Sequence, residues 1–173
     1  MIELRPASCA DLGALWETRT RAVAHSCAAH YTGAVLNAWL TAAMPDSLRE
    51  LVSKGGAIAA EEAGRMLGYA VLDADSGEVT AVFVEPAAQG RGIGSMLLDA
   101  VQDAARAAGV KRLFLSASLN GVPFYGRAGF VALREELYPH RSGVGIPSVY
   151  MEKCLDPLSQ RPAAPGASTS PGS

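Results

Sequence analysis

Residues 82–95 read VFVEPAAQGRGIGS, and the rest of the chain is organised around this stretch. An apolar strand is predicted to end at Val84, and Pro86 then turns the chain out of the sheet, because proline has no amide hydrogen for a sheet ladder. Three glycines follow on alternate positions, and an amphipathic helix is predicted to begin directly behind them. A strand, a glycine loop and a helix N-terminus together favour phosphate binding, since bare amides and the helix dipole converge on the anion.

Two common phosphate-binding loops do not fit this stretch. A dinucleotide fingerprint has G-x-G-x-x-G and an acidic residue at the end of the next strand, whereas the glycines here are at 90, 92 and 94 and the next predicted strand ends in serines. A Walker loop requires Gly-Lys-Ser/Thr, whereas Gly94 is followed by Ser95 and Met96. On these residues alone, a plain strand-to-helix turn stays open as the alternative to a phosphate site.

The stretch instead resembles the signature loop of the Gcn5-related N-acetyltransferase family, Gln/Arg-x-x-Gly-x-Gly/Ala, which is present as residues 89–94. The second marker of that family, Phe-Tyr-x-x-x-Gly-Phe, is present as residues 124–130, after the next predicted strand. The resemblance extends over about residues 2–154 and is strongest over 78–130. It implies an α/β fold, with a mixed, mostly antiparallel twisted sheet flanked by helices, and acetyl-CoA as the co-substrate.

Length and composition suit one globular domain with a sizeable core, because the chain has 173 residues and 49% of them are hydrophobic. We assign 1–155 to the N-acetyltransferase domain and 156–173, rich in Pro, Ala, Ser and Gly, to a disordered tail. A net charge of -2 indicates neither nucleic acid nor an anionic membrane as a partner, and no apolar run approaches the ~20 residues of a membrane helix. Three unpatterned cysteines and an N-terminus without an apolar signal core predict a reduced, cytoplasmic location.

Hydrophobic periodicity and turn residues predict the remaining elements. Helices are expected at about 9–29, 33–43, 48–52, 93–108 and 123–128, and strands at about 2–5, 57–62, 66–73, 78–84, 110–117, 130–137 and 148–154. The resemblance implies that the early helices form one wall of the acceptor site. A predicted loop at 138–147 could overhang that site.

The resemblance divides the coenzyme A site between the glycine loop and the strand before it. The loop would hold the diphosphate through its amides, with a guanidinium that suits phosphate oxygens added by Arg91; its members are Gln89, Gly90, Arg91, Gly92, Ile93, Gly94 and Ser95. In this family the preceding strand splays from its neighbour, so backbone groups of Val82 and Val84 would pair with the pantetheine arm. Phe83 lies between them, and an ordinary sheet residue facing the core is its alternative.

A further pantetheine contact is implied at the end of the next strand. Members of this family often carry an asparagine seven positions before the tyrosine of the second marker, and that position is Ser118 here. Asn120 lies five positions before the tyrosine, so the assignment is divided between Ser118 and Asn120. An ordinary loop asparagine is the alternative for Asn120.

Acetyl transfer from a thioester to an amine needs a held thioester, a deprotonated amine and a protonated leaving thiolate. Tyr125 is the candidate general acid, because the resemblance places it near the sulfur and a phenol is a suitable proton source for a thiolate. A buried tyrosine that only finds a hydrogen-bond partner is its alternative. Glu78 matches the catalytic glutamate of the histone-modifying branch, which works through water; a polar turn without a dedicated base is its alternative.

The histidines and cysteines predict no metal site. His25, Cys27 and His30 fit no zinc spacing, and the two histidines do not share a helical face. Tyr138 and His140 could touch an acceptor or belong to a solvated loop.

We therefore expect an enzyme that transfers acetyl directly to the primary amine of a small molecule. No cysteine is placed beside a histidine as a nucleophile, and no peptide-docking extension is evident. A protein N-terminus or lysine as the acceptor, and a non-catalytic acyl-CoA sensor, are the alternatives. Members of that family often dimerise, which leaves a homodimer open, and the sequence alone does not decide the oligomeric state.

Overall fold

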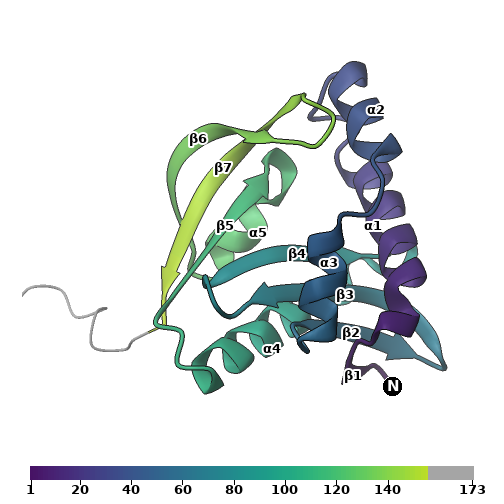
Figure 1. Ribbon diagram of the computed structural model, residues 1–173, viewed down its shortest axis with the longest axis vertical. Coiled ribbons are helices and arrows are strands. Elements are labelled where there is room, and N and C mark those ends of the chain that lie inside the picture. Colours follow the sequence, from purple (N-terminus) through teal and green to yellow (C-terminus); the bar gives the residue numbers. More distant parts are fainter. Residues whose placement is uncertain (156–173) are drawn as a thin grey trace, which may run out of the picture.

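A seven-stranded sheet in the order β1-β2-β3-β4-β5-β7-β6 organises residues 1–155, the part of the chain that the computed structural model describes (Figure 1). Its strands are β1 (Glu3–Pro6), β2 (Ala57–Glu62), β3 (Arg65–Asp73), β4 (Glu78–Val84), β5 (Arg112–Ser118), β6 (Val131–Pro139) and β7 (Gly145–Cys154). Neighbouring strands are antiparallel except β4 and β5, which are parallel. The predicted mixed, mostly antiparallel α/β fold is confirmed, whereas the tail assigned to 156–173 lies outside the described residues.

Local sequence accounts for where the helices begin. They are α1 (Leu12–Ser26), α2 (Gly33–Thr41), α3 (Asp46–Ser53), α4 (Ile93–Ala107) and α5 (Val122–Arg127), with 3₁₀ turns at Cys9–Asp11, Pro86–Ala88 and Leu119–Gly121. Thr32 precedes α2, and its hydroxyl accepts a hydrogen bond from the amide of Val35 at 3.3 Å. Pro45 precedes α3, where its missing amide hydrogen breaks no helical hydrogen bond. Within residues 1–155, no helix has the length and hydrophobicity needed to cross a membrane.

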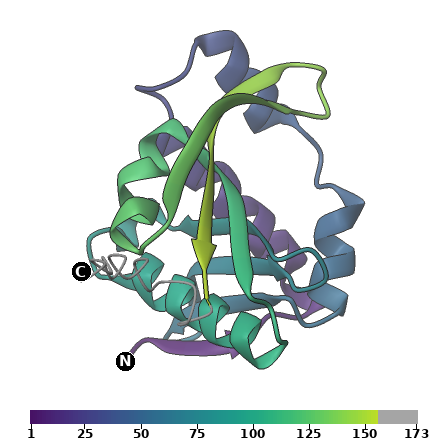
Figure 2. The same cartoon turned by 90° about the vertical axis from the view of Figure 1, so that its left-hand side faces the viewer.

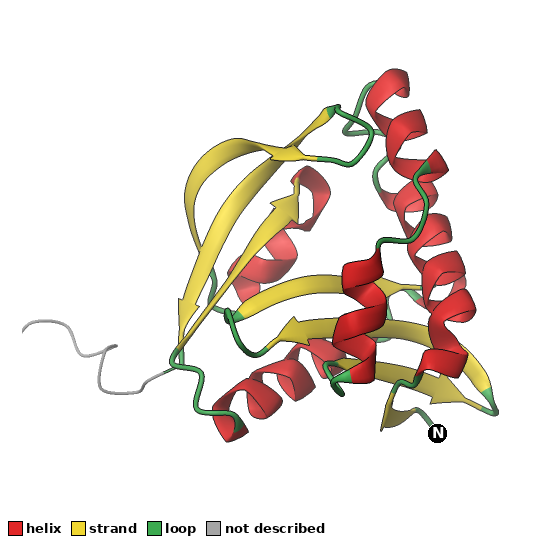
Figure 3. Cartoon of the chain, in the orientation of Figure 1, coloured by secondary structure: helices red, strands yellow, loops and turns green. Residues whose placement is uncertain are grey.

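Helices cover both faces of the β2–β4 half of the sheet and create two cores (Figure 3). Helix α4 packs on one face through buried side chains that include Leu97 and Leu98. Helices α1 and α3 pack on the other face, where Leu15 contacts the cluster around Tyr69. Successive side chains of a strand point to opposite faces, so β3 contributes Tyr69 to one core and Ala70 to the other.

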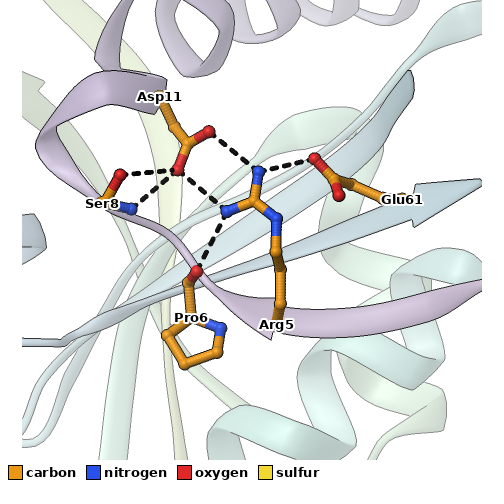
Figure 4. A network of polar contacts seen from close by, with 5 residues as sticks. All are labelled: Arg5, Pro6, Ser8, Asp11 and Glu61. Atoms are coloured by element: carbon orange, nitrogen blue, oxygen red, sulfur yellow. Dashed lines mark hydrogen bonds and ion pairs between the residues drawn. The ribbon is translucent and has the colours of Figure 1, made fainter. Parts of the chain in front are cut away.

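Arg5 fastens the first strand to the turn before α1 and to β2 (Figure 4). Its guanidinium donates hydrogen bonds to the Asp11 carboxylate at 2.8 and 2.9 Å and to Glu61 at 2.5 Å. It also donates to the carbonyl oxygen of Pro6, while the amide of Ser8 donates to Asp11. The Arg5 guanidinium holds the pKa of Asp11 well below its usual range, so the carboxylate that fixes the entry to α1 stays charged.

Two predicted boundaries were wrong. The helix expected over 9–29 is a 3₁₀ turn followed by α1, and it ends at Ser26. Strands β6 and β7 pair as far as Pro139 and Gly145, so the predicted loop at 138–147 shrinks to a tight connection over 140–144. The partner strand rather than the local composition decides how far a hairpin extends, which explains the second error.

We predict that Leu97→Ala lowers the free energy of unfolding by about 2–5 kcal/mol, because Leu97 is fully buried between α4 and the sheet. Chemical denaturation monitored by circular dichroism measures this change. Leu133→Ala is the matched control, since Leu133 on β6 is 53% exposed and its truncation should change stability by less than about 0.5 kcal/mol. Equal effects of the two substitutions would contradict the assignment of the core.

Candidate active site

Strands β4 and β5 meet at one point and then diverge (Figure 1). Their register pairs Glu78 with Phe114, and the amide of Phe114 donates to the carbonyl oxygen of Gly77 at 3.0 Å. Beyond this point β4 stays paired with β3 as far as Val84, while its other edge has no partner strand among residues 1–155. The free backbone groups on that edge are available to a ligand, as the resemblance implies for the pantetheine arm.

A cavity of about 1010 Å³ lies at this divergence. The glycine loop, β4, β5 and α5 line it on one side, and α1–α3 with the β6–β7 connection line it on the other. The predicted site residues that line it are Glu78, Val82, Phe83, Val84, Gln89, Gly90, Gly92, Ile93, Gly94, Ser95, Ser118, Asn120 and Tyr125. Arg91 is the one predicted site residue that does not line the cavity.

The glycine loop has the backbone conformation that its composition predicts. Gly90 and Gly92 adopt left-handed φ angles of +78° and +77°, which residues with a Cβ rarely adopt. A Cβ on Gly94 would lie 3.3 Å from the ring of Phe124, so a glycine there lets α4 approach α5 closely. The first amides of α4, including that of Ser95, have no acceptor within the helix and line the cavity. The loop can therefore donate several hydrogen bonds to one anion.

Two loop side chains make contacts that the sequence did not reveal. Arg91 donates hydrogen bonds to both carboxylate oxygens of Glu62 on β2, at 2.9 and 3.1 Å, and the pair is exposed. The side-chain nitrogen Nε2 of Gln89 donates a hydrogen bond to the hydroxyl of Ser26 at 3.0 Å, which connects the loop to the end of α1. A contact between Arg91 and a phosphate stays a prediction, and it requires the guanidinium to share or leave Glu62.

The end of β5 contributes two polar side chains to the cavity, and both pantetheine candidates stay open. Ser118 is the last residue of β5 and lies opposite Ser148 of β7. Asn120 follows in the next turn, where its side-chain oxygen accepts a hydrogen bond from the Cys27 thiol at 3.3 Å. Phe83 lines the cavity and also packs against Tyr69, with ring centroids 5.8 Å apart, and its contact with the pantetheine arm stays a prediction.

Tyr125 is held in the cavity wall by two aromatic neighbours. Its ring makes edge contacts with Phe124 and Phe130, with centroids 5.0 and 5.8 Å away. Its hydroxyl makes no hydrogen bond with any residue of 1–155, so it is available to a ligand. Burial raises the pKa of Tyr125 well above its usual value, so the phenol keeps its proton throughout the physiological range.

Glu78 lies at the opposite end of β4 from the glycine loop, where β4 and β5 touch. It is half-buried and lines the cavity. Burial raises the pKa of Glu78 above its usual value, and the charge of Asp73 raises it further. A carboxylate with a raised pKa is a stronger proton acceptor than an exposed one, which suits the predicted role of a base.

The cysteine that lines the cavity, Cys27, is not a thiolate nucleophile. Burial raises the pKa of the Cys27 thiol to about 11, although the charge of Arg19 lowers it in part, so Cys27 stays protonated. His25 and His30 are exposed and are not part of the cavity lining. Among residues 1–155, no group of three or more metal-ligating side chains comes together.

Sequence reasoning missed Arg19, Trp16 and Trp39, which form the α1–α2 wall of the cavity. A signal for Arg19 was present, because it lies four residues after Leu15 and four before Val23, on the apolar face of α1. A charged residue on that face lies inside the protein and needs a partner there.

The family model described as "Acetyltransferase (GNAT) domain" matches residues 27–155. The chain belongs to this acetyltransferase family. The "IAA acetyltransferase" of Azospirillum brasilense is 35% identical over 105 residues, which cover 57% of this chain and 67% of that protein. These similarities and the structure make the protein an N-acetyltransferase of the GNAT class.

Solved GNAT structures share the fold. A GCN5-related N-acetyltransferase from Rhodopseudomonas palustris matches with a TM-score of 0.79 at 25% identity, over 88% of this chain and 94% of that one. The yncA protein of Salmonella typhimurium, solved with its cofactor acetyl-CoA, matches with a TM-score of 0.61 at 26% identity, over 96% and 99% of the two chains. The PaiA N-acetyltransferase of Thermoplasma acidophilum, in complex with coenzyme A, has a TM-score of 0.68 at 18% identity over 89% and 99%, and this likeness shows the fold alone.

We predict that Arg91→Ala weakens coenzyme A binding about tenfold, as expected for the loss of one charge-assisted hydrogen bond to a phosphate. We predict that Glu62→Gln strengthens binding, because it releases the guanidinium that Glu62 now holds. Isothermal titration calorimetry measures both dissociation constants. Arg106→Ala on the exposed face of α4 is the control, and equal affinities in all three variants would mean that Arg91 has no phosphate contact.

Proposed function

We propose that this protein transfers the acetyl group of acetyl-CoA directly to the primary amine of a small molecule. The observation that carries the proposal is the joint presence of four groups in one cavity. These are the amides at the start of α4, the free edge of β4, the protonated phenol of Tyr125 and the carboxylate of Glu78. Their arrangement supports a position of acetyl-CoA in which the diphosphate lies at the loop and the thioester lies further along β4, towards Glu78.

Each reacting group has a role in the transfer. Glu78, through a water molecule, accepts the proton of the ammonium so that the amine can attack the thioester carbonyl carbon. The new C–N bond forms, the C–S bond breaks, and the hydroxyl of Tyr125 donates its proton to the departing sulfur. The second proton that the nitrogen loses returns to the Tyr125 oxygen, and Glu78 releases the first proton to solvent, so that both groups are restored. The protonated thiol of Cys27 is a poor nucleophile, which supports direct transfer without an acyl-enzyme.

Hydrogen bonds between the two walls of the cavity support a small acceptor rather than a peptide. The hydroxyl of Tyr31, between α1 and α2, donates to the carbonyl oxygen of Pro147 at 2.7 Å and accepts from the amide of Leu119 at 2.9 Å. These bonds join the helical wall to β7 and to the turn after β5. The Tyr31 contacts link the two walls at this end of the site, and Figure 2 shows the tip of the β6–β7 hairpin near α2.

We predict that Tyr125→Phe lowers kcat about 100-fold while the dissociation constant of coenzyme A stays within about twofold, because the substitution removes a proton donor and keeps the ring packing. Thiol release at saturating acetyl-CoA and calorimetry measure the two quantities. Tyr150→Phe is the control, since the Tyr150 hydroxyl donates to Glu152 outside the cavity. An unchanged kcat would show that Tyr125 is not the acid, and a protein that binds coenzyme A but never turns over would be a sensor.

We predict that kcat/KM rises with pH through the raised pKa of Glu78, because the carboxylate can accept a proton only above that pKa. Below that pKa Glu78 is neutral and cannot act as the base. The value of kcat/KM therefore falls on the acid side of the pH profile. Glu78→Gln should remove this limb and lower kcat/KM by about 100-fold, leaving only the titration of the amine itself. Asp75→Asn in the exposed turn before β4 is the control, and a limb that survives in Glu78→Gln would assign it to another group.

A further inference from the structure

Helix α1 places a buried guanidinium in the wall of the active-site cavity. Arg19 is 4% exposed and lines the cavity. Its Nη2 donates to the backbone oxygen of Trp39 at 2.7 Å, and its guanidinium lies 4.3 Å from the centre of the Trp16 ring. Its Nη1 is buried and has no hydrogen-bond acceptor among residues 1–155. The Nη1 edge of the guanidinium is thus left without an acceptor among residues 1–155.

The charge of Arg19 is also unbalanced. No carboxylate of residues 1–155 forms an ion pair with it, whereas Arg21, on another face of the same helix, pairs with Glu85 and Glu17. Burial lowers the pKa of Arg19, and the ionisable groups that act on it are Tyr69 and Cys27, which carry no negative charge at neutral pH. An unpaired buried charge is costly, so a ligand that supplies the opposite charge would relieve that cost.

The surroundings of Arg19 form a subsite with its own character. His140 and Arg141, from the β6–β7 connection, line the same cavity and add positive or polar groups. Burial lowers the pKa of His140, and the charges of Arg19 and Arg141 lower it further. Trp16, Trp39 and Tyr69 supply aromatic surface beside them. The acidic residues of the lining, Asp73 and Glu78, lie at the hairpin end of β3 and β4.

The diphosphate of coenzyme A does not account for this subsite. The glycine loop contacts the end of α1, where Gln89 donates to Ser26. Arg19 lies seven residues earlier on the same helix, which is about 10 Å along its axis. It is therefore on the acceptor side of the cavity, against the two tryptophans, rather than at the loop.

We propose that Arg19 binds the carboxylate of the acceptor and that the acceptor is an α-amino acid with an apolar or aromatic side chain. This inference rests on the proposed function, whose acceptor it specifies. A guanidinium presents parallel N–H groups that match a carboxylate, and Nη1 is the donor still free. The carboxylate neutralises Arg19, the side chain lies against the aromatic wall, and the amine is left to face Glu78 and the thioester.

The first experiment compares free amino acids with their amides. We measure acetyl-CoA-dependent thiol release with L-leucine, L-methionine, L-phenylalanine and L-tryptophan and with the four corresponding amides. The acids should have kcat/KM values about 10- to 100-fold above those of the amides, as expected for a hydrogen bond between charged groups. The amines of the amides are less basic than those of the acids, so a larger fraction of them is neutral at a given pH. Deprotonation alone would therefore favour the amides, and a preference for the acids cannot come from it. Equal or higher values for the amides would overturn the proposal.

The second experiment uses variants of the helix. Arg19→Gln should remove the preference for acids and leave the dissociation constant of coenzyme A within about twofold of the wild-type value, while Arg19→Lys should retain part of the preference. Arg21→Gln removes the same charge on another face and should keep the preference in full. Melting temperatures show whether each variant is folded. The comparison of acids with amides uses the wild-type protein, so it remains a test of the proposal even if a variant does not fold. A preference that survives in folded Arg19→Gln would overturn the assignment.

Calorimetry separates this proposal from the proposed function. The amino acid with the lowest KM, or each of the four if none is acetylated, is titrated into the protein saturated with coenzyme A. Binding that Arg19→Gln abolishes, without any acetyl transfer, would support the carboxylate subsite and contradict the acetyltransferase reaction with these acceptors. Transfer to amines without binding of any of the four acids would support the reaction and overturn the subsite.

Discussion

The structure depends on the single contact between β4 and β5. A parallel pair that continued past Glu78 and Phe114 would close the sheet and fill the space in which the cavity lies. Because the two strands diverge instead, β4 keeps a free edge, the N-terminus of α4 opens into the gap, and α5 brings Tyr125 to its far side. The divergence thus explains three features of the site together: the free backbone groups of β4, the anion site at α4 and the position of Tyr125. Helices α1 and α3 then close the gap from the other face of the sheet.

Polar contacts fix the walls of this gap, and the exceptions lie inside it. Glu85, directly after β4, accepts hydrogen bonds from Thr18 and Arg21, so the middle of α1 is tied to the end of β4. The buried side-chain polar atoms of residues 1–155 that lack a partner are Arg19 Nη1 and Ser148 Oγ, and both residues line the cavity. Buried polar groups are normally satisfied within a protein. Because both atoms belong to residues of one cavity, we infer that a bound ligand supplies their missing hydrogen bonds.

The sequence predicted the parts of the site that local spacing determines. Gly90 and Gly92 adopt a backbone that few other residues could adopt, Gly94 leaves room for the ring of Phe124, and the second marker predicted Tyr125 on the short helix after β5. What depends on distant partners was not predictable in the same way. The ion pair of Arg91 joins residues 29 positions apart, and the length of the β6–β7 hairpin follows from its pairing. Arg19 could have been suspected from its place on an apolar helical face, but only the packing of α2 and β3 shows that it lacks a counter-ion.

The most direct test of this reading is the amide NMR spectrum of the protein at saturating coenzyme A. We predict that the amides of Gly90, Gly92, Gly94 and Ser95 shift together with those of the free edge of β4, since both groups of donors face the diverging strands. Signals from the exposed face of β6 should stay in place. If the loop and β4 signals do not move while the ligand is bound, the gap between β4 and β5 is not the coenzyme A site.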